Sequence, residues 1–250
     1  MTRFSLLLLA AAMAAAPAAR AEKSCESDLD YGVTLEARQV LLQDGSSVYV
    51  LANGELRKDG KSVPLSGKEK QQIRAYETGL RALVPQVNAV TREALAIAGE
   101  ATEFAFATLL GPEHESVMAL RGKFANLGKE LGKRMDDQHL PAKPMSLRDE
   151  DWDVVGEGAA ISWNVAEASF ALVGKAMRAA FDEDYAKKWE ADLKKMETEL
   201  DAKVEARAKQ LESKAESLCD NLAELDQIEA SLSQSNQALR DFDVVRYRAK

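Results

Sequence analysis

Residues 204–239 read VEARAKQ-LESKAES-LCDNLAE-LDQIEAS-LSQSNQA-L when they are written in groups of seven. Each group begins with an apolar residue, and Ala208, Ala215 and Leu222 add a second apolar position four residues later. An apolar seam with this period predicts a long helix of coiled-coil type. The prediction is strengthened by the absence of glycine and proline from residues 175–250.

Two architectures fit this seam. A continuous helix over residues 183–240 would be roughly 87 Å long at 1.5 Å per residue. Asn221 followed by Glu224 resembles the cap of a new helix, so a hairpin that folds back near Asn221 is the alternative. In both cases we interpret the seam as internal packing between helices, with docking of another protein as the other possibility.

Further helices are predicted upstream of the seam. Ser66 and Glu69 fit a capping box that begins a helix running to about Leu83, and Pro85 is expected to kink or restart that helix. The next two helices are expected over about 86–110 and 113–136, followed by a loop over 139–144.

The helix expected over about 157–181 is the least polar part of the chain after its first residues. A helix that is apolar nearly all round belongs in the middle of a bundle, and we predict that position for it. Membrane insertion is the alternative, which four charged residues in this stretch disfavour.

Residues 33–65 alternate apolar and polar positions between short turn signals. Asn53-Gly54 and Asp59-Gly60 are typical of two-residue hairpin turns, so three or four short antiparallel strands are expected. The predicted fold class is therefore α+β and mainly α, with a small N-terminal antiparallel β-meander packed on a bundle of long helices.

The first residues, MTRFSLLLLAAAMAAAPAARA over 1–21, have the layout of a secretory signal peptide, with cleavage expected after Ala21. We expect the remaining chain, 22–250, to form one structural unit. It would comprise a β-meander at 22–66, a helical segment at 67–145, and a second helical segment at 146–250 that carries the heptads.

The composition favours a water-soluble globular protein. The chain has 250 residues with 33 basic against 41 acidic side chains, and cleavage of the leader would remove Arg3 and Arg20, leaving a net charge of −10. Such an acidic chain is poorly suited to nucleic acid or to anionic lipid surfaces. We expect no nucleic-acid partner and no membrane span, and we leave the oligomeric state open.

Two cysteines, Cys25 and Cys219, remain after the expected cleavage. In an oxidising compartment one disulfide between them is the favoured interpretation, and two free buried thiols are the alternative. The bridge would join the N-terminus to a late helix and stabilise the fold by on the order of 5 kcal/mol at most.

The sequence offers little catalytic chemistry. His114 and His139 lie in no metal-binding pattern, and the acids at 149–153 lack the glycine and the glutamate of an EF-hand loop, so no metal and no cofactor are expected. Lys123, Lys129, Lys133 and Arg134 form with Arg121 a modest basic face, interpreted as solvated rather than as a site for an anionic partner. Gly128 and Gly132 predict a close helix crossing.

One stretch resembles the YggN-like family of exported Gram-negative proteins, and it comprises Asn53-Gly54, Gly60-Lys61, Leu65, Gln71-Gln72, Tyr76, Leu80-Arg81 and Pro85. Members of that family also have a signal peptide, one cysteine soon after it and one near the C-terminus, which Cys25 and Cys219 match. The resemblance implies residence in the periplasm and implies no activity, because the family has no established biochemical function.

We therefore expect a non-enzymatic periplasmic protein, a binding, scaffold or chaperone-like module that takes an envelope protein or an apolar ligand between its helices. The alternative is a hydrolase whose carboxylates meet only in the fold, from Glu100, Glu103 or the 149–153 cluster. A concavity that brings polar groups together would favour the hydrolase, and an apolar groove would favour binding.

Overall fold

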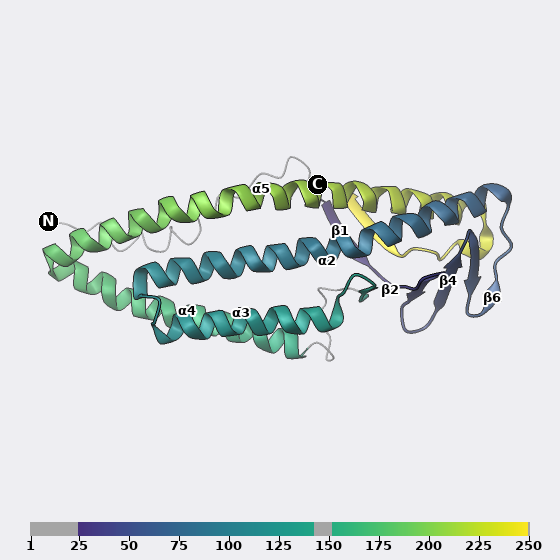
Figure 1. The fold of residues 1–250 in the computed structure, drawn as a ribbon. Helices are drawn as coiled ribbons and strands as arrows, with labels where there is room; N and C mark the ends of the chain where they lie inside the picture. The colour runs from purple at the N-terminus through teal and green to yellow at the C-terminus, as the bar shows by residue number, and fades with distance from the viewer. Residues whose placement is uncertain (1–24, 143–151, 250) are drawn as a thin grey trace.

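The computed structural model describes residues 25–142 and 152–249, and it has the predicted α+β, mainly α class. An antiparallel sheet lies at one end of an elongated molecule, and long helices extend from it (Figure 1). The expected leader, residues 1–21, lies outside the described residues.

The larger sheet has six strands in the order β6-β5-β4-β3-β2-β7, which is more than the three or four predicted. Its strands are β2 (Gly32–Leu35), β3 (Val40–Gln43), β4 (Val48–Ala52), β5 (Glu55–Lys58), β6 (Lys61–Ser62) and β7 (His139–Leu140). Strand β7 lies where a loop was predicted, because two residues after α3 pair with β2.

The hairpin turns are formed as predicted. Asn53 and Gly54 both have positive φ, at 53° and 84°, and Asp59 and Gly60 do so at 50° and 77°. Two successive residues in this conformation give the turn whose twist matches that of paired strands. Both turns therefore set the register of the strands β4, β5 and β6.

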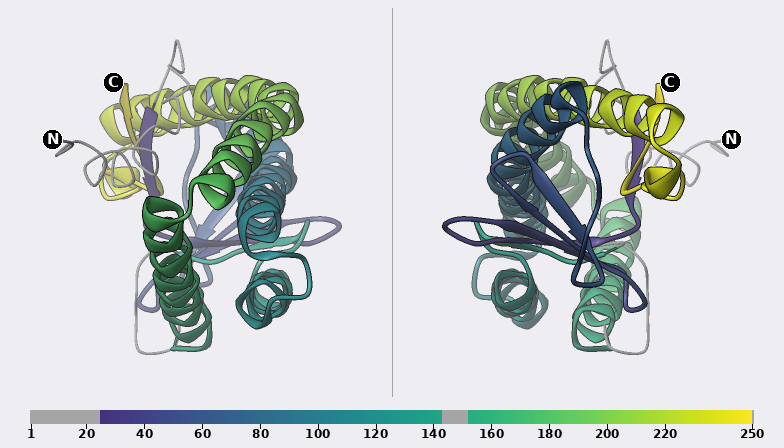
Figure 2. Two further views of the ribbon diagram at one scale, coloured as in Figure 1. Left: turned by 90° about the vertical axis from the view of Figure 1, so that its left-hand side faces the viewer. Right: turned by 90° about the vertical axis from the view of Figure 1, so that its right-hand side faces the viewer.

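Four long helices follow in the described part of the chain. They are α2 (Gly67–Leu110), α3 (Glu115–Arg134), α4 (Trp152–Phe181) and α5 (Glu183–Ser235). Viewed along the long axis they are arranged in the order α5, α2, α3, α4 (Figure 2), so each packs on its neighbours in that ring. The tip of the molecule is formed by α4 and α5 alone, since both extend beyond the turn between α2 and α3 (Figure 1).

Helix α2 begins with the predicted capping box. The Ser66 side chain accepts a hydrogen bond from the Glu69 backbone N–H at 3.3 Å, and the Glu69 carboxylate accepts one from the Ser66 N–H at 2.6 Å. The prediction that Pro85 restarts the helix is wrong, because α2 continues through it as one element of 44 residues. Packing against α5 on one side outweighs the single backbone hydrogen bond that a proline removes.

Helix α5 is one continuous helix, so the alternative of a hairpin that folds back near Asn221 is wrong. Its 53 residues are unbroken and span about 80 Å at 1.5 Å per residue. Asn221 caps no new helix; its side-chain amide donates to Gln86 Oε1 of α2 at 2.7 Å. The heptad seam packs internally where it runs beside α2, as Leu222, Leu225 and Leu232 are buried there.

The main core lies between the sheet, the first half of α2 and the last third of α5. Tyr49 of β4, Tyr76 of α2 and Phe242 of the C-terminal segment meet there in edge-to-face contacts, with ring centroids 5.0 and 5.4 Å apart. A second, smaller core joins α2, α3 and α4 and is formed by Phe106, Leu110, Val117, Leu120 and Ala168. The seam predicts neither the short helix η2 (Gln237–Leu239) nor the strand β8 (Val245–Ala249) that follow α5.

The first and last strands of the described chain meet on α5. Strand β1 (Cys25–Leu29) pairs antiparallel with β8, so that Leu29 is opposite Val245, and Cys25 is bonded to Cys219 of α5. The S–S distance is 2.02 Å and the Cα atoms are 5.8 Å apart across a sequence separation of 194 residues. The predicted disulfide is therefore confirmed.

A buried glutamate fixes the approach to β8. Glu229 of α5, 3% exposed, accepts hydrogen bonds from Tyr76 Oη and from the backbone N–H groups of Val244, at 2.7 Å, and Val245, at 3.2 Å. Burial raises the pKa of Glu229 from its ordinary 4.5 to about 8, because loss of hydration outweighs those three donors, and the nearby Asp243 carboxylate adds to the effect.

The helix expected in the middle of the bundle is in fact its outer helix, so that prediction is wrong. One face of α4 packs on α3 and α5, and the opposite face exposes large apolar side chains to solvent. Within the described ranges, no helix combines the length and the apolarity that a membrane crossing requires.

Reduction of the disulfide is expected to lower the free energy of unfolding by about 2–5 kcal/mol, because it releases a very long loop in the unfolded chain. Urea unfolding with and without reductant measures this change. The Cys25→Ser/Cys219→Ser variant is the control, since it should match the reduced chain and ignore reductant. An oxidised chain whose midpoint does not move on reduction would contradict the expectation.

The raised pKa of Glu229 predicts a pH dependence of stability. Between about pH 5 and 8 the folded chain holds a proton that the unfolded chain has lost, so the free energy of unfolding falls as pH rises, by about 1 kcal/mol per pH unit. Asp226, whose pKa burial and Asp243 also raise, acts in the same direction. Glu229→Gln should therefore flatten the curve without abolishing it.

Chemical unfolding at several pH values measures that difference between wild type and variant. Parallel curves for the two proteins would show that Glu229 carries no such proton.

Candidate functional site

A groove of about 370 Å³ lies between α2 and α3. Leu95 of α2 and Phe124, Leu131 and Met135 of α3 and its C-terminal cap supply its large apolar side chains. Most of its accessible lining is apolar, and its volume lies within the range of small-molecule sites.

Small residues on both helices leave this space open. Ala96 and Gly99 of α2 line it together with Ala125, Gly128 and Gly132 of α3. A Cβ at Gly132 would have no atom within 4 Å, and one at Gly128 would lie 3.5 Å from a Leu95 methyl. The close crossing predicted at the two glycines is therefore wrong at Gly132, where they border a groove instead.

One end of the groove contains an unpaired donor. Asn88 of α2 is 2% exposed and lines the groove, and its side-chain Nδ2 has no hydrogen-bond partner in the described structure. A buried amide without a partner costs free energy, so such groups are rare in folded proteins. One turn further along α2, Arg92 lines the same end and pairs at 3.4 Å with the exposed Asp137.

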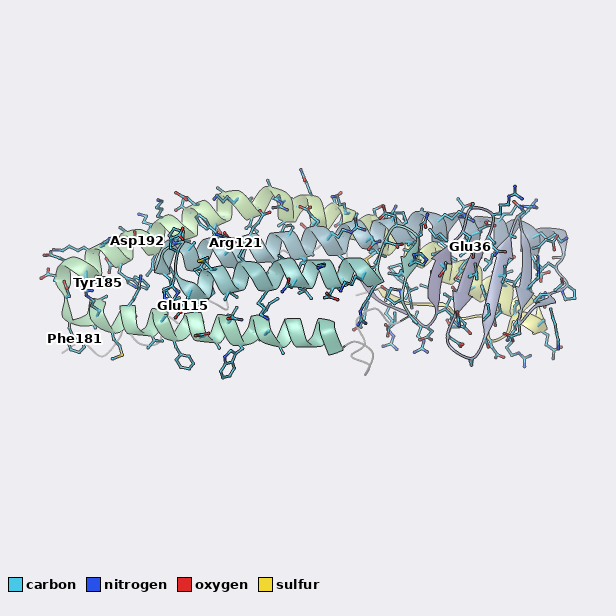
Figure 3. All side chains as sticks on the ribbon, turned by 60° about the horizontal axis from the view of Figure 1, so that its bottom comes forward. Glu36, Glu115, Arg121, Phe181, Tyr185 and Asp192 are labelled. Carbon is cyan, nitrogen blue, oxygen red and sulfur yellow. A yellow bond between two sulfur atoms is a disulfide. The ribbon has the colours of Figure 1, made fainter. Side chains whose placement is uncertain are left out.

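The other end of the groove is bordered by ion pairs. Arg121 of α3 contacts Glu103 of α2 at 2.6 Å, and Figure 3 shows Arg121 close to the turn between these helices. Arg207 of α5 contacts both Glu93, at 2.9 Å, and Glu100. These ion pairs join α2 to α3 and to α5.

The structure brings two of the hydrolase candidates together and leaves each of them paired. Glu100 and Glu103 both border the groove, but each carboxylate is bonded to an arginine. Of the other candidates, Asp149, Glu150 and Asp151 lie outside the described residues, and Asp153 is in α4 with no side chain described. The arrangement therefore supplies charge pairs rather than an isolated acid and base.

The two histidines have local roles. His114 is the N-cap of α3, and its Nδ1 accepts a hydrogen bond from the Ser116 N–H at 3.3 Å. His139 Nδ1 lies 2.8 Å from an Asp136 carboxylate oxygen in the turn before β7. In the part of the chain that the structure describes, no group of three or more His, Cys, Asp or Glu side chains is placed to hold a metal.

The basic face predicted on α3 is partly neutralised. Arg121 is paired with Glu103, and Lys133 is paired with Glu130 at 2.6 Å. Since neighbouring acids compensate these charges, the face offers little attraction to an anionic macromolecule.

The fold and the groove together define a mainly helical α+β protein with an apolar interhelical cavity. The chain belongs to the family described as a protein of unknown function (DUF2884), whose model matches residues 25–245. No curated protein and no solved structure matches the chain.

The sequence led us to expect an apolar ligand between helices but not which helices form the groove, although part of that signal was visible. The Gly128-x-x-x-Gly132 spacing indicates a thin helix face, but a thin face is compatible with close packing or with a cavity. Asn88 gave no signal at all, because an asparagine in an amphipathic helix is ordinarily exposed.

Proposed function

We propose that this protein is a non-enzymatic binding module that holds an acyl-chain amphiphile in the groove between α2 and α3. The observation that carries the proposal is the buried Nδ2 of Asn88, which has no hydrogen-bond partner among the described residues and lies at one end of an otherwise mainly apolar groove.

The ligand class follows from the lining. An unpaired N–H donor is satisfied by an acceptor oxygen, and Arg92 beside it favours an anionic head such as a carboxylate. The groove follows α2 from Asn88 to Glu103, about 22 Å at 1.5 Å per residue, which suits an extended tail rather than a compact ring. Leu95, Phe124 and Leu131 would cover that tail.

We further propose that the chain is exported to the periplasm of a Gram-negative bacterium, with cleavage after Ala21. The disulfide supports export, because such bonds persist in oxidising compartments. The leader-like residues 1–21 and the resemblance to the YggN-like family support it as well. Handling of an envelope protein remains the alternative form of a non-enzymatic role.

Palmitate is expected to displace the apolar dye Nile red from the oxidised chain. It should bind more tightly than cetyltrimethylammonium, which has a tail of the same length and no acceptor oxygen. This order is informative because a protein with net negative charge would by itself attract the cation. Asn88→Leu should lower palmitate affinity by about tenfold while leaving stability unchanged or raised, since it removes a buried unpaired donor.

A matched pair of variants tests whether the groove is the site. Gly132→Leu fills the groove and should lower affinity by at least about tenfold. Gly122→Leu is the control on the same helix: its Cβ also meets no atom within 4 Å, but it does not line the groove. Both changes raise helix propensity by about 1 kcal/mol, so their effects on stability should match. Equal affinities for these two variants, or no palmitate binding by wild type, would overturn the proposal.

A further inference from the structure

The outer face of α4 is an apolar stripe with a heptad spacing. Trp163, Phe170 and Met177 are seven residues apart, and Ala166, Val173 and Ala180 occupy the positions three residues after them. The four large side chains of this set are 46–77% exposed, namely those of Trp163, Phe170, Val173 and Met177. Phe181 at the end of the helix is 91% exposed. Figure 3 shows Phe181 at the tip of the molecule, beside the turn into α5 and far from the sheet. This outer stripe, residues 163–181 of α4, is a helix-packing seam without a partner helix in the described chain.

The area of the outer stripe is appropriate for a specific interface. Given the exposed fractions of its three rings and two aliphatic side chains, it presents on the order of 600 Å² of apolar surface. That equals or exceeds the largest apolar patch of a typical monomer. Two such stripes face to face would bury on the order of 1,200 Å², the lower limit for stable and specific complexes.

Its side chains complement one another when two copies run in opposite directions. An antiparallel pair centred near Ala171 and Leu172 places Trp163 opposite Ala180, Met177 opposite Ala166, and Phe170 opposite Val173. Large side chains then meet small ones in each layer, as in well-packed helix pairs. A parallel pair would instead place Trp163 against Trp163.

The charges on the outer stripe favour the same direction. Glu167 and Arg178 are its two exposed charged residues, one in each half of the stripe. Arg178 also lies 3.9 Å from Asp182 and over the Tyr185 ring of its own chain. An antiparallel pair brings Glu167 of each copy beside the Arg178 of the other, where Gly174 leaves room for both side chains. A parallel pair would place the two copies of Glu167, and those of Arg178, on opposite sides of the seam and would form no such ion pairs.

We propose that α4 docks on α4 of a second copy of this chain, forming a two-fold antiparallel homodimer through the outer stripe. The groove between α2 and α3 takes no part in this contact, so the dimer and the ligand site are independent of each other.

Sedimentation equilibrium of the oxidised chain is the first test, and a monomer–dimer equilibrium is expected. Phe170→Glu places a charge in the central layer and should raise the dimer dissociation constant by more than about 100-fold. Met118→Glu is the matched control, because Met118 is 53% exposed on α3 and lies outside the outer stripe. Thermal melts confirm that both variants fold.

A charge reversal tests the direction and does not depend on the Phe170 variant. Glu167→Arg and Arg178→Glu should each weaken the dimer, and the double variant should recover most of the loss. A short bifunctional maleimide should join two copies of Val173→Cys, whose positions lie about 5 Å apart along the axis. It should not join two copies of Trp163→Cys, which lie about 25 Å apart.

Several results would overturn the proposal. They are a chain that stays monomeric at all concentrations, a dimer that Phe170→Glu leaves intact, and equal crosslinking at the two cysteine positions. A monomer that floats with phosphatidylethanolamine and phosphatidylglycerol vesicles, and loses flotation in Phe170→Glu, would identify a membrane surface as the occupant instead.

Discussion

The packing of α5 on α2 is the contact on which the rest of the structure depends. These two helices support the sheet at one end of the molecule and the shorter helices α3 and α4 at the other (Figure 1). The heptad seam of α5 buries Leu222, Leu225 and Leu232 against α2, and polar links such as Asn221 to Gln86 fix the register between the two helices. Apolar burial supplies most of the stability, and the polar links select one alignment.

Strands β1 and β8 are held by three different kinds of interaction at the same place. A disulfide fixes β1 to α5, a strand pair joins β1 to β8, and the buried Glu229 orients the residues that lead into β8. Removal of any one of these interactions leaves the other two in place. The disulfide and the Glu229 hydrogen bonds both depend on α5 remaining helical through residues 219–229. A single helix therefore positions both the first and the last strand that the structure describes.

Sequence periodicity predicted those parts of the fold that depend on local chemistry. These parts follow from residue types at short spacings or from a single possible pairing. They are the Asn53-Gly54 and Asp59-Gly60 turns, the Ser66 cap, the seam of α5 and the disulfide.

The wrong predictions concern the exposure of α4, the effect of Pro85 on α2, and the two-residue strand β7. The apolar composition of α4 indicated burial, yet exposure depends on whether a partner covers Phe170 and Trp163, which composition does not specify. Strand β7 exists because β2 lies beside it, so the partner and not its own two residues determines it. The groove is a property of two helices together, and neither helix alone encodes it.

The position of α5 in the chain also affects the order in which the protein can form. The six-stranded sheet is complete after β7 and α2 packs on its strands β2 to β5, but the core that they share is completed by residues between Leu222 and Val245, near the end of the polypeptide. A growing chain emerges from its N-terminus, so the core between the sheet and α2 stays incomplete until the last part of the chain has been made. A chain interrupted before residue 222 would therefore lack Phe242, which contacts Tyr49 and Tyr76, and the apolar side chains left exposed around those two rings would favour aggregation.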